Sequence, residues 1–228
     1  MAGVVRLTYF DGRGLSEQIR FMLADTGTKY EERTITTPLL KQLRENGKLF
    51  FKQLPLLEID GLNLVQSGAI MRYLARKHNM YGSNATEAYQ CDMIADGLAD
   101  FRKSFTSFDN FRLRKKDEAG YISQVSTLLP KYLRPLEEML KANNGGEKRG
   151  FLLGGEKIAY ADVSLVEILE HVNEMFPGVL EKDYPYLGSF RERMLERPGL
   201  KDHYSSGKRK PPINDEYIAH VNEVFERK

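Results

Sequence analysis

The sequence contains no tryptophan and only one cysteine, Cys91, among its 228 residues. A single cysteine excludes an intrachain disulfide, a CxxC redox pair and a thiolate zinc cluster. It also favours a reducing compartment, so we expect a cytoplasmic protein. A chain of this length buries roughly 70% of the surface that its unfolded form exposes, which is enough to fold without a disulfide or a structural metal.

Neither sign of charge dominates, and long apolar runs are missing. The chain has 34 basic and 32 acidic residues, interspersed, for a formal net charge of +2. This balance argues against nucleic acid as the main partner. No apolar stretch approaches the ~20 residues of a membrane span, and the N-terminus lacks the apolar core of a signal peptide. We therefore expect neither a nucleic-acid nor a membrane partner.

Several motifs of common active sites are also absent. The four histidines are scattered without an HxxxH pair, so no metal site is predicted. The chain holds no Walker loop, no Rossmann glycine fingerprint and no G-x-S-x-G elbow. These absences argue against a P-loop nucleotidase, a dinucleotide enzyme and an α/β-hydrolase.

The first 82 residues alternate between strand and helix patterns. Strands are predicted over residues 4–10, 29–35 and 54–65, and helices over 15–27, over 38–46 and from Ser67 onward. Asp60-Gly61 lies between two apolar runs and predicts a two-residue hairpin turn. Ser67 is predicted to cap its helix. The order β-α-β-α-β-β-α favours an α/β domain in which a hairpin adds an antiparallel edge.

After residue 82 no convincing strand pattern remains. Helices are predicted over residues 91–108, 118–142, 162–176 and 186–197, and a last one after a cap at Asn214. Pro130 and Pro135 predict kinks or a break in the second of these. The 162–176 segment is apolar on most sides and should be the buried central helix. We predict an α/β domain over residues 1–82 and an all-helical domain over 83–228.

Tyr9 is the first candidate for chemistry. It ends the first predicted strand, next to the turn Gly12-Arg13-Gly14 that leads into a helix. A hydroxyl placed there would lie near a helix N-terminus, where anions are stabilised. The alternative is an aromatic side chain that simply anchors the strand in the core.

The segment around Pro55 and the Gln66-Ser67 pair form a second candidate region. Pro55 either begins a strand in an ordinary way or follows a cis peptide bond that leaves the backbone of Leu54 available to a peptide-like ligand. Gln66-Ser67 stands at a strand-to-helix junction, where N–H groups and the Ser67 hydroxyl can hold a carboxylate. Capping and binding are compatible at that junction.

An acidic stripe runs along the first long helix of the second domain. Asp92, Asp96 and Asp100 follow one another at four-residue spacing, where like charges repel by a few tenths of a kcal/mol per pair. The stripe is either a solvated face or a binding site for an ammonium group.

Taken together, these segments resemble cytosolic glutathione S-transferases. The resemblance rests on LTYFDGRGLSEQIRFML, QLPLLEIDG, VQSGAIMRYLARKHNMYG and YADVSLVEIL, which occur in the family's order and cover almost the whole chain. The KPP tail before the last helix resembles the alpha class, and the QS pair and LADF segment also resemble sigma and mu members. The resemblance implies a thioredoxin-like N-terminal domain, an all-α C-terminal domain and a homodimer.

It also implies glutathione as co-substrate, with no other cofactor, and assigns residues to each part of the tripeptide. Tyr9 would donate its hydroxyl to the sulfur, and Leu54, before a cis Pro55, would pair with the cysteinyl backbone. The remaining contacts implied are Gln66 and Ser67 at the γ-glutamyl end, Arg44 and Gln53 at the glycine end, and Asp100 and Lys131 acting across the dimer. Phe51 would be the aromatic key that inserts into the neighbouring subunit.

The second substrate implied is a hydrophobic electrophile bound between the domains, with possible peroxidase or isomerase side activity. The matching positions are Phe10, Gly14, Thr106, Ser107, Asn110, Ile213, Val221 and Phe225. The chain departs from the alpha-class pattern at Leu15, where that class usually has an arginine that assists the thiolate. It departs again at Ala159, which replaces a capping serine or threonine, although Asp162 remains.

Two other functions fit the same scaffold. One is a non-catalytic carrier of apolar ligands or a crystallin-like structural protein, and the other is a sigma-type prostaglandin isomerase. Retention of Tyr9, Gln66 and Asp100 favours the transferase, because a structural protein does not need them. The sequence therefore predicts an alpha-like glutathione transferase.

Overall fold

A computed structural model describes residues 3–144, 146–207 and 209–226. The chain forms two compact units, of which the first comprises the residues up to Tyr73 and from Asp202 onward, and the second comprises Leu74–Lys201. The last segment of the chain thus groups with the α/β unit, which differs from the predicted division at residue 82. The compact units do not test the predicted boundary between two sequence domains at residue 82, so that boundary stays a prediction.

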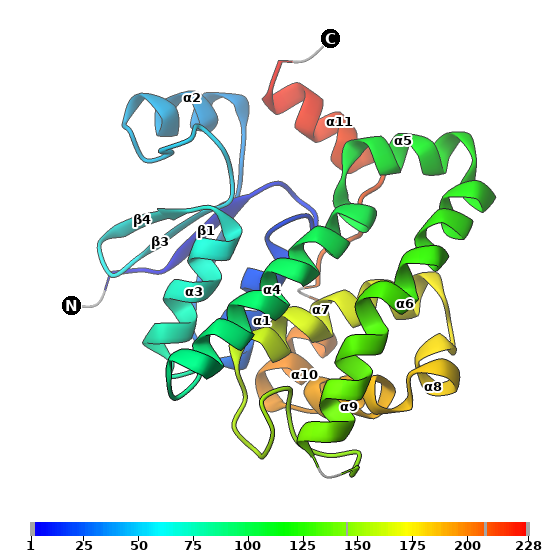
Figure 1. Cartoon of the computed structure of the whole chain (residues 1–228). Helices are drawn as coiled ribbons and strands as arrows, with labels where there is room; N and C mark the ends of the chain where they lie inside the picture. The colour runs from blue at the N-terminus through cyan, green and yellow to red at the C-terminus, as the bar shows by residue number, and fades with distance from the viewer. Residues whose placement is uncertain (1–2, 145, 208, 227–228) are drawn as a thin grey trace. The chain divides into compact units, whose positions relative to one another are not determined.

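The first unit contains a four-stranded mixed sheet (Figure 1). Its strands are β1 (Arg6–Tyr9), β2 (Glu31–Thr34), β3 (Leu56–Ile59) and β4 (Leu62–Val65), in the order β2-β1-β3-β4. β1 pairs in parallel with β2 and antiparallel with β3, and β3 and β4 form a hairpin. The turn residues Asp60 and Gly61 have φ of 52° and 77°, as a primed two-residue turn requires. The predicted hairpin is confirmed.

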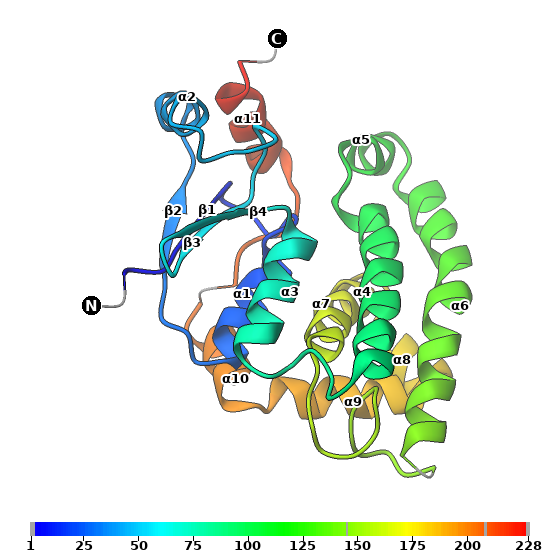
Figure 2. The same ribbon diagram turned by 60° about the vertical axis from the view of Figure 1, so that its left-hand side comes forward.

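Helices cover both faces of this sheet. α1 (Glu17–Asp25) and α3 (Ser67–Lys77) lie on one face, and α2 (Thr37–Glu45) and α11 (Asp215–Val224) on the other (Figure 2). α1 forms because Ile19, Met22 and Leu23 recur at helical spacing, and the structure buries all three completely.

The junction before α3 corrects one expectation. Ser67 is the first helical residue rather than the cap, and the carbonyl of Gln66 accepts the first helical hydrogen bond from Ile70 N–H at 3.0 Å. Gln66 therefore takes the cap position, with a left-handed φ of 69°.

The described residues of the second unit form helices and connecting loops, with no strand among them. Its helices are α4 (Ala85–Thr106), α5 (Phe108–Lys116), α6 (Glu118–Asn143), α7 (Tyr160–Met175), α8 (Val179–Asp183) and α9 (Pro185–Leu195), followed by α10 (Pro198–Ser205), which runs into the first unit. α7 packs against α4 and α9 and is buried from Tyr160 to Val172, as predicted for the central helix. α6 continues through Pro130 and Pro135, so the break allowed for in the prediction is absent from this helix.

A buried ion pair joins α4 to α7. Arg102 donates two hydrogen bonds to one carboxylate oxygen of Glu167, at 2.9 and 2.7 Å, and His171 lies 3.1 Å from the other oxygen. Burial acts to raise the pKa of Glu167, but the charge of Arg102 and the contact with His171 outweigh it and lower that pKa to about 2. The ring of His171 stacks on Phe105 at 5.2 Å.

Among the described residues, none of the helices combines the length and the apolar character that a bilayer span requires.

Candidate active site

Tyr9 ends β1 beside the start of α1. The residue is 6% exposed, and its hydroxyl oxygen accepts a hydrogen bond from the backbone N–H of Leu15 at 3.1 Å. Leu15 thus contributes through its backbone at the position where the alpha class usually carries an arginine. The hydroxyl has a backbone donor on its oxygen and its own proton available to donate.

The turn between β1 and α1 is shaped by two glycines. Gly14 has a left-handed φ of 43°, and a β-carbon there would stand 2.5 Å from the Tyr9 hydroxyl oxygen. A β-carbon at Gly12 would overlap the ring of Tyr217. The glycines therefore let the chain pass close to both tyrosines, which a larger residue would push away.

A network of buried charged groups around Arg20 holds this turn in place. Arg20 is completely buried and donates to Gly12 O at 2.9 Å, to Glu17 at 2.8 Å and to Glu32 at 2.7 Å. Burial acts to raise the pKa of Glu17, but the hydrogen bond with His203 and the charge of Arg20 outweigh it, so that pKa is lowered. Glu17 stays charged and keeps Arg20 in place against the turn.

Tyr217 is a site residue that the sequence reasoning missed. It lies in α11, and its hydroxyl donates to the Tyr9 oxygen at 3.4 Å. Helical spacing could have revealed its burial, because Tyr217, Val221 and Val224 recur at i, i+4 and i+7 and all three are buried.

Aromatic side chains of α11 and of Phe225, which follows it, gather around Phe10, the residue after β1. Its ring centroid lies 5.9 Å from that of Tyr217, 5.7 Å from His220 and 5.7 Å from Phe225. Of the positions predicted to contact the electrophile, Phe10 and Phe225 are thus in contact, Val221 is buried, and Ile213 is half-buried. The first unit offers an apolar surface next to the Tyr9 hydroxyl.

Gly14, another predicted electrophile position, lies in the turn beside Tyr9, and three more positions, Thr106, Ser107 and Asn110, hold the corner between α4 and α5. The Thr106 hydroxyl donates to Arg102 O at 3.0 Å, the Ser107 hydroxyl accepts from Asn110 N–H at 3.2 Å, and the Asn110 amide donates to Lys103 O at 2.9 Å. Their polarity therefore has a local structural reason, since they satisfy backbone groups at two helix ends. Their contact with an electrophile stays a prediction.

Some of the residues predicted to bind the two ends of the tripeptide lie next to one another. The amide of Gln66 donates to the amide oxygen of Gln53 at 3.4 Å, and Ser67 opens α3 next to them. The Leu54–Pro55 bond between these segments is cis, as the resemblance implies. The left-handed backbone of Gln66 costs roughly 1 kcal/mol, a cost that is typical of binding sites.

Arg44 lies in the last turn of α2. Its guanidinium donates to Lys52 O at 3.3 and 3.1 Å and stands 5.6 Å from the centre of the Phe225 ring. The glycine-end candidate is therefore anchored to the loop before Gln53 and lies over the ring of Phe225, the residue after α11.

The acidic stripe of α4 has two different environments. Asp92 accepts hydrogen bonds from the hydroxyls of Tyr81 at 2.6 Å and Tyr160 at 2.5 Å, so it is a structural residue and not part of a solvated face. Asp100 is exposed and pairs with Lys103 at 2.7 Å, and this hydrogen bond, with the charges of Lys103 and Lys131, lowers the pKa of Asp100. The candidates Asp100 and Lys131 thus act on each other electrostatically within one chain.

The cap of α7 is half formed. Ala159 offers no side-chain acceptor, but Asp162 accepts from Ala159 N–H at 2.8 Å and from Leu152 N–H at 2.9 Å. The predicted loss of the cap at Ala159 is confirmed, and Asp162 compensates by tying the preceding loop to the helix.

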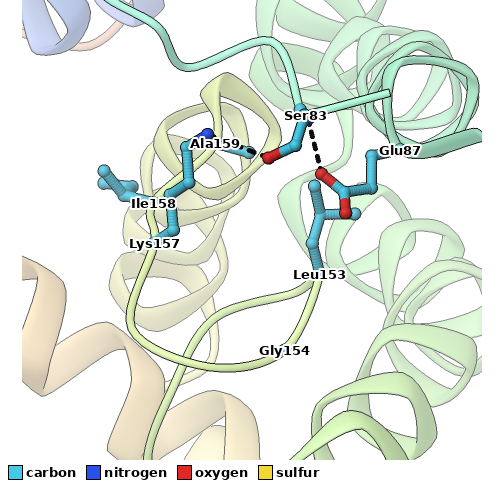
Figure 3. Close-up of a pocket in the computed structure, with 8 residues that line it drawn as sticks. Ser83, Glu87, Leu153, Gly154, Lys157, Ile158 and Ala159 are labelled. Carbon is cyan, nitrogen blue, oxygen red and sulfur yellow. Dashed lines mark hydrogen bonds between the residues drawn. The ribbon is translucent and has the colours of Figure 1, made fainter. Parts of the chain in front are cut away.

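A small cavity of about 130 Å³ lies in the second unit (Figure 3). Ser83 N–H donates to Glu87 at 2.6 Å, and the Lys157 ammonium donates to the Ser83 hydroxyl at 3.0 Å. None of the predicted site residues lines this cavity. Its charged groups bind a backbone N–H and a serine hydroxyl of the same loop, which is a structural arrangement.

Comparison with known proteins places the chain in a family. The model for the glutathione S-transferase N-terminal domain matches residues 5–76, and that for the C-terminal domain matches residues 99–207. Glutathione S-transferase alpha-5 of Rattus norvegicus is 38% identical over 95% of each chain, and glutathione S-transferase A1 of Bos taurus is 36% identical over 99% of each. The chain therefore belongs to the glutathione S-transferase family.

Solved structures agree with this assignment. A pi-class glutathione S-transferase of Onchocerca volvulus superposes with a TM-score of 0.75 at 33% identity, covering 94% of this chain and 99% of that one. Within the family, two of the sequence relatives are alpha-class by name, the rat alpha-5 protein and glutathione S-transferase alpha M14 of Sus scrofa, which is 37% identical over 99% of each chain. The predicted family and the predicted architecture, a thioredoxin-like α/β domain with an all-α partner domain, are confirmed.

Proposed function

We propose that this protein is a glutathione transferase that conjugates the thiolate of glutathione to hydrophobic electrophiles. The observation that carries the proposal is the Tyr9 hydroxyl, whose oxygen accepts the N–H of Leu15 at 3.1 Å at the entry to α1. Because that contact uses the oxygen as an acceptor, the phenolic proton remains for a sulfur anion. Family membership supports the same reaction.

The energy that this reaction needs is modest. A free thiol has a pKa near 8.5, so only a few per cent is thiolate at pH 7. Lowering that pKa by about two units requires roughly 2.7 kcal/mol of extra stabilisation of the anion. A hydrogen bond from Tyr9 to the sulfur, together with the N–H groups at the start of α1, supplies energy of that order.

The transfer step then follows from thiolate chemistry. The sulfur lone pair forms a bond to the electrophilic carbon, and the leaving group departs with the electron pair of the bond that breaks, or the pair moves into an adjacent carbonyl. The protein forms no covalent intermediate, and its contribution after ionisation is to hold the two reactants together.

Binding of the tripeptide is assigned to one edge of the first unit. Leu54 pairs with the cysteinyl backbone, Gln66 and Ser67 hold the γ-glutamyl carboxylate, and Arg44 and Gln53 hold the glycine carboxylate. The contact between Gln53 and Gln66, and the position of Ser67 at the start of α3, support this assignment. N–H groups at a helix start favour a carboxylate.

The functional protein is proposed to be a cytoplasmic homodimer. Phe51 is the proposed interface key, and its 58% exposure, beside Phe50 at 80%, supports an apolar surface that a second copy covers. Asp100 then reaches the ammonium group of glutathione in the partner, and Lys131 acts across the same interface. The exposure of Asp100 supports this role.

The apolar side of the reaction is assigned to α11 and its neighbours. Phe10, Gly14, Val221 and Phe225, with Ile213, offer a surface for a hydrophobic electrophile within the first unit. The contact between Phe10 and Phe225 supports an apolar site.

Titration of the sulfur in the complex tests the proposed function. The ultraviolet absorbance of the thiolate is followed against pH for glutathione bound to the parent protein and for glutathione in buffer. A midpoint at least one unit lower in the complex is expected, and an unchanged midpoint contradicts the proposal. Turnover of aryl halides, alkenals, hydroperoxides and a prostaglandin endoperoxide then separates a transferase from a carrier and from an isomerase.

A further inference from the structure

The hydroxyl oxygen of Tyr9 receives two hydrogen bonds within the protein. One comes from Leu15 N–H at 3.1 Å and the other from the Tyr217 hydroxyl at 3.4 Å. A phenolic oxygen has two lone-pair positions and carries one proton. When both lone-pair positions accept, the proton of Tyr9 is the only part of the group that can still form a hydrogen bond.

We propose that Tyr217 is a positioning residue whose hydroxyl fixes the orientation of the Tyr9 hydroxyl and strengthens the hydrogen bond from Tyr9 to the sulfur of glutathione. The inference rests on the proposed function. It deepens that function by adding α11 to the groups that activate the thiol. Tyr217 itself does not touch the sulfur.

The position of Tyr217 is fixed by a hydrogen bond of its backbone and by the packing of its ring. Its backbone N–H donates to the capping oxygen of Asn214 at 2.8 Å, and its ring is 6% exposed, against Phe10 at 5.9 Å. Gly12 leaves the room that the ring fills, and a β-carbon at Gly14 would come within 2.9 Å of the Tyr217 oxygen. The contact between the two hydroxyls is therefore made by buried side chains, and the glycines of the turn leave the space for it.

Polar contacts at and just after the C-terminal end of α11 tie it to α2 within the first unit. The Thr37 hydroxyl donates to Glu223 O at 3.2 Å, and Lys41 pairs with Glu226 at 2.7 Å. These contacts join α11 to α2 and keep Tyr217 above the turn. The helix thus brings a hydroxyl to Tyr9 from more than two hundred residues away in the sequence.

Tyr217 remains a donor over the pH range in which the enzyme would work. Burial, and then the neighbouring Tyr9 hydroxyl, raise the pKa of Tyr217 well above its usual value, and the charge of Arg20 lowers it only in part. Titratable groups around the turn also include Arg13, Glu17 and His203, as well as Asp11, which pairs with Lys210 at 2.7 Å, and His220, which lies 2.9 Å from Ile35 O.

The hydrogen bond that Tyr217 donates to Tyr9 polarises the Tyr9 hydroxyl, which makes the Tyr9 proton a stronger donor to the sulfur. Hydrogen bonds in a chain strengthen one another by about 10–30% per bond in a region of low dielectric constant. Loss of the Tyr217 hydroxyl should therefore leave glutathione bound but make its sulfur less acidic. The effect is expected at the sulfur and not at the carboxylates of the tripeptide, which Tyr217 does not face in the proposed assignment.

The test compares Tyr217→Phe with the parent and with Tyr73→Phe. Tyr73→Phe is the matched control because it also removes one hydroxyl, which donates to Asp60 at 2.6 Å. Tyr217→Phe keeps the ring that fills the space beside Gly12. We expect it to raise the pKa of the bound sulfur by about 0.3–0.7 units and to lower kcat/KM at about pH 6.5 roughly two- to fivefold.

The pH profile separates this role from a packing role. The rates of Tyr217→Phe and parent should converge above the pKa of the sulfur, where both are ionised, and KM for glutathione should stay within twofold. An unchanged sulfur pKa in Tyr217→Phe overturns the proposal. A lower sulfur pKa and a faster reaction also overturn it, because Tyr217 would then compete with the sulfur for Tyr9.

Failure of the proposed function gives a different result. In that case the sulfur of glutathione in the parent complex titrates as it does in buffer. The phenol of Tyr9 is then titrated directly, as the absorbance difference between each protein and its Tyr9→Phe counterpart. If Tyr217 donates to Tyr9, the pKa of this phenol is higher in the Tyr217→Phe background, and equal values refute the contact itself.

Discussion

Gly14 and Tyr9 fit together with no space for a methyl group, because a β-carbon on Gly14 would stand 2.5 Å from the Tyr9 hydroxyl oxygen. Gly14→Ala should therefore displace Tyr9 as well as strain a left-handed backbone, whose φ is 43°. We expect a loss of about 1–3 kcal/mol in the free energy of unfolding and at least a tenfold lower kcat/KM. Urea unfolding and steady-state kinetics measure the two effects.

Gly27→Ala is the control for the backbone cost alone. Gly27 has a φ of 64°, and a β-carbon there has nothing within 4 Å. This variant should lose about 1 kcal/mol of stability and keep its activity. Equal loss of activity in the two variants would show that the contact between Gly14 and Tyr9 is irrelevant to the reaction.

Tyr9→Phe removes the proposed donor to the sulfur and keeps the ring in the core. Glutathione binding should stay within twofold, and conjugation of a generic aryl halide near neutral pH should slow at least tenfold, which corresponds to about 1.4 kcal/mol. Stopped-flow or steady-state rates, with binding measured by calorimetry, check both parts. A rate equal to that of the parent ends the assignment of Tyr9.

Asp100→Asn tests the proposed contact across the dimer. Removal of one carboxylate charge should weaken glutathione binding about three- to tenfold, with no change of fold. Asp109→Asn is a close control, because Asp109 is also exposed and also faces a cation three residues later, Arg112, at 3.7 Å. Calorimetric titration with glutathione measures the affinity of both variants. Equal affinities in Asp100→Asn and Asp109→Asn would show that Asp100 does not belong to the binding site.

Phe51→Ser tests the proposed interface key. Loss of an aromatic anchor from a dimer interface costs about 2 kcal/mol or more, so the variant should dissociate at concentrations where the parent remains a dimer. Sedimentation velocity measures the shift. Phe50→Ser removes the more exposed neighbouring ring, 4.8 Å away, and should shift the equilibrium less. The same dissociation in both would identify a general apolar contact without a key residue.

The pair Arg102–Glu167 predicts how stability falls in acid. The pKa of Glu167 is lowered from 4.5 to about 2 in the folded protein, so its ionised form stabilises the fold above pH 4.5. This contribution, on the order of 3 kcal/mol, is lost as the pH falls from about 4.5 toward 2. Urea unfolding at a series of pH values should show the loss in the parent.

Glu167→Gln should lose stability already at neutral pH, by about 3 kcal/mol, because Arg102 keeps a buried charge without its partner. Its dependence on pH between 4.5 and 2 should be shallower than that of the parent. Glu138→Gln removes a carboxylate from the exposed side of α6 and serves as the control. If the free energy of unfolding fell by the same amount between pH 4.5 and 2 in the parent and both variants, the Arg102–Glu167 pair would not be the source of the acid sensitivity.

The elements of the fold with strong apolar periodicity were predictable from the sequence. The buried faces of α1 and α7 and the Asp60-Gly61 turn appear where the residues place them. Helix α5 was not predicted, because its sequence FDNFRLRKK buries no residue and so carries no apolar pattern. The predicted helix over residues 91–108 ends instead at Thr106, where Ser107 starts α5 by capping it.

The candidate site was predictable in part for a similar reason. Tyr9, Gln66 and Ser67 belong to local motifs, so their neighbourhood could be inferred from a few adjacent residues. The approach of Tyr217 to Tyr9 joins segments that are 208 residues apart, and it depends on space left by Gly12 and Gly14. No local pattern reports a contact of that kind.

The buried cation Arg20 links the shape of the turn between β1 and α1 to the edge of the sheet, because it binds Gly12 O and the carboxylate of Glu32 on β2 at the same time. Sequence changes on β2 that neutralise Glu32 would therefore reach Tyr9, the proposed donor to the sulfur, without touching it. Under the proposed function, changes on this edge strand adjust the acidity of the bound thiol while every residue assigned to the tripeptide stays the same.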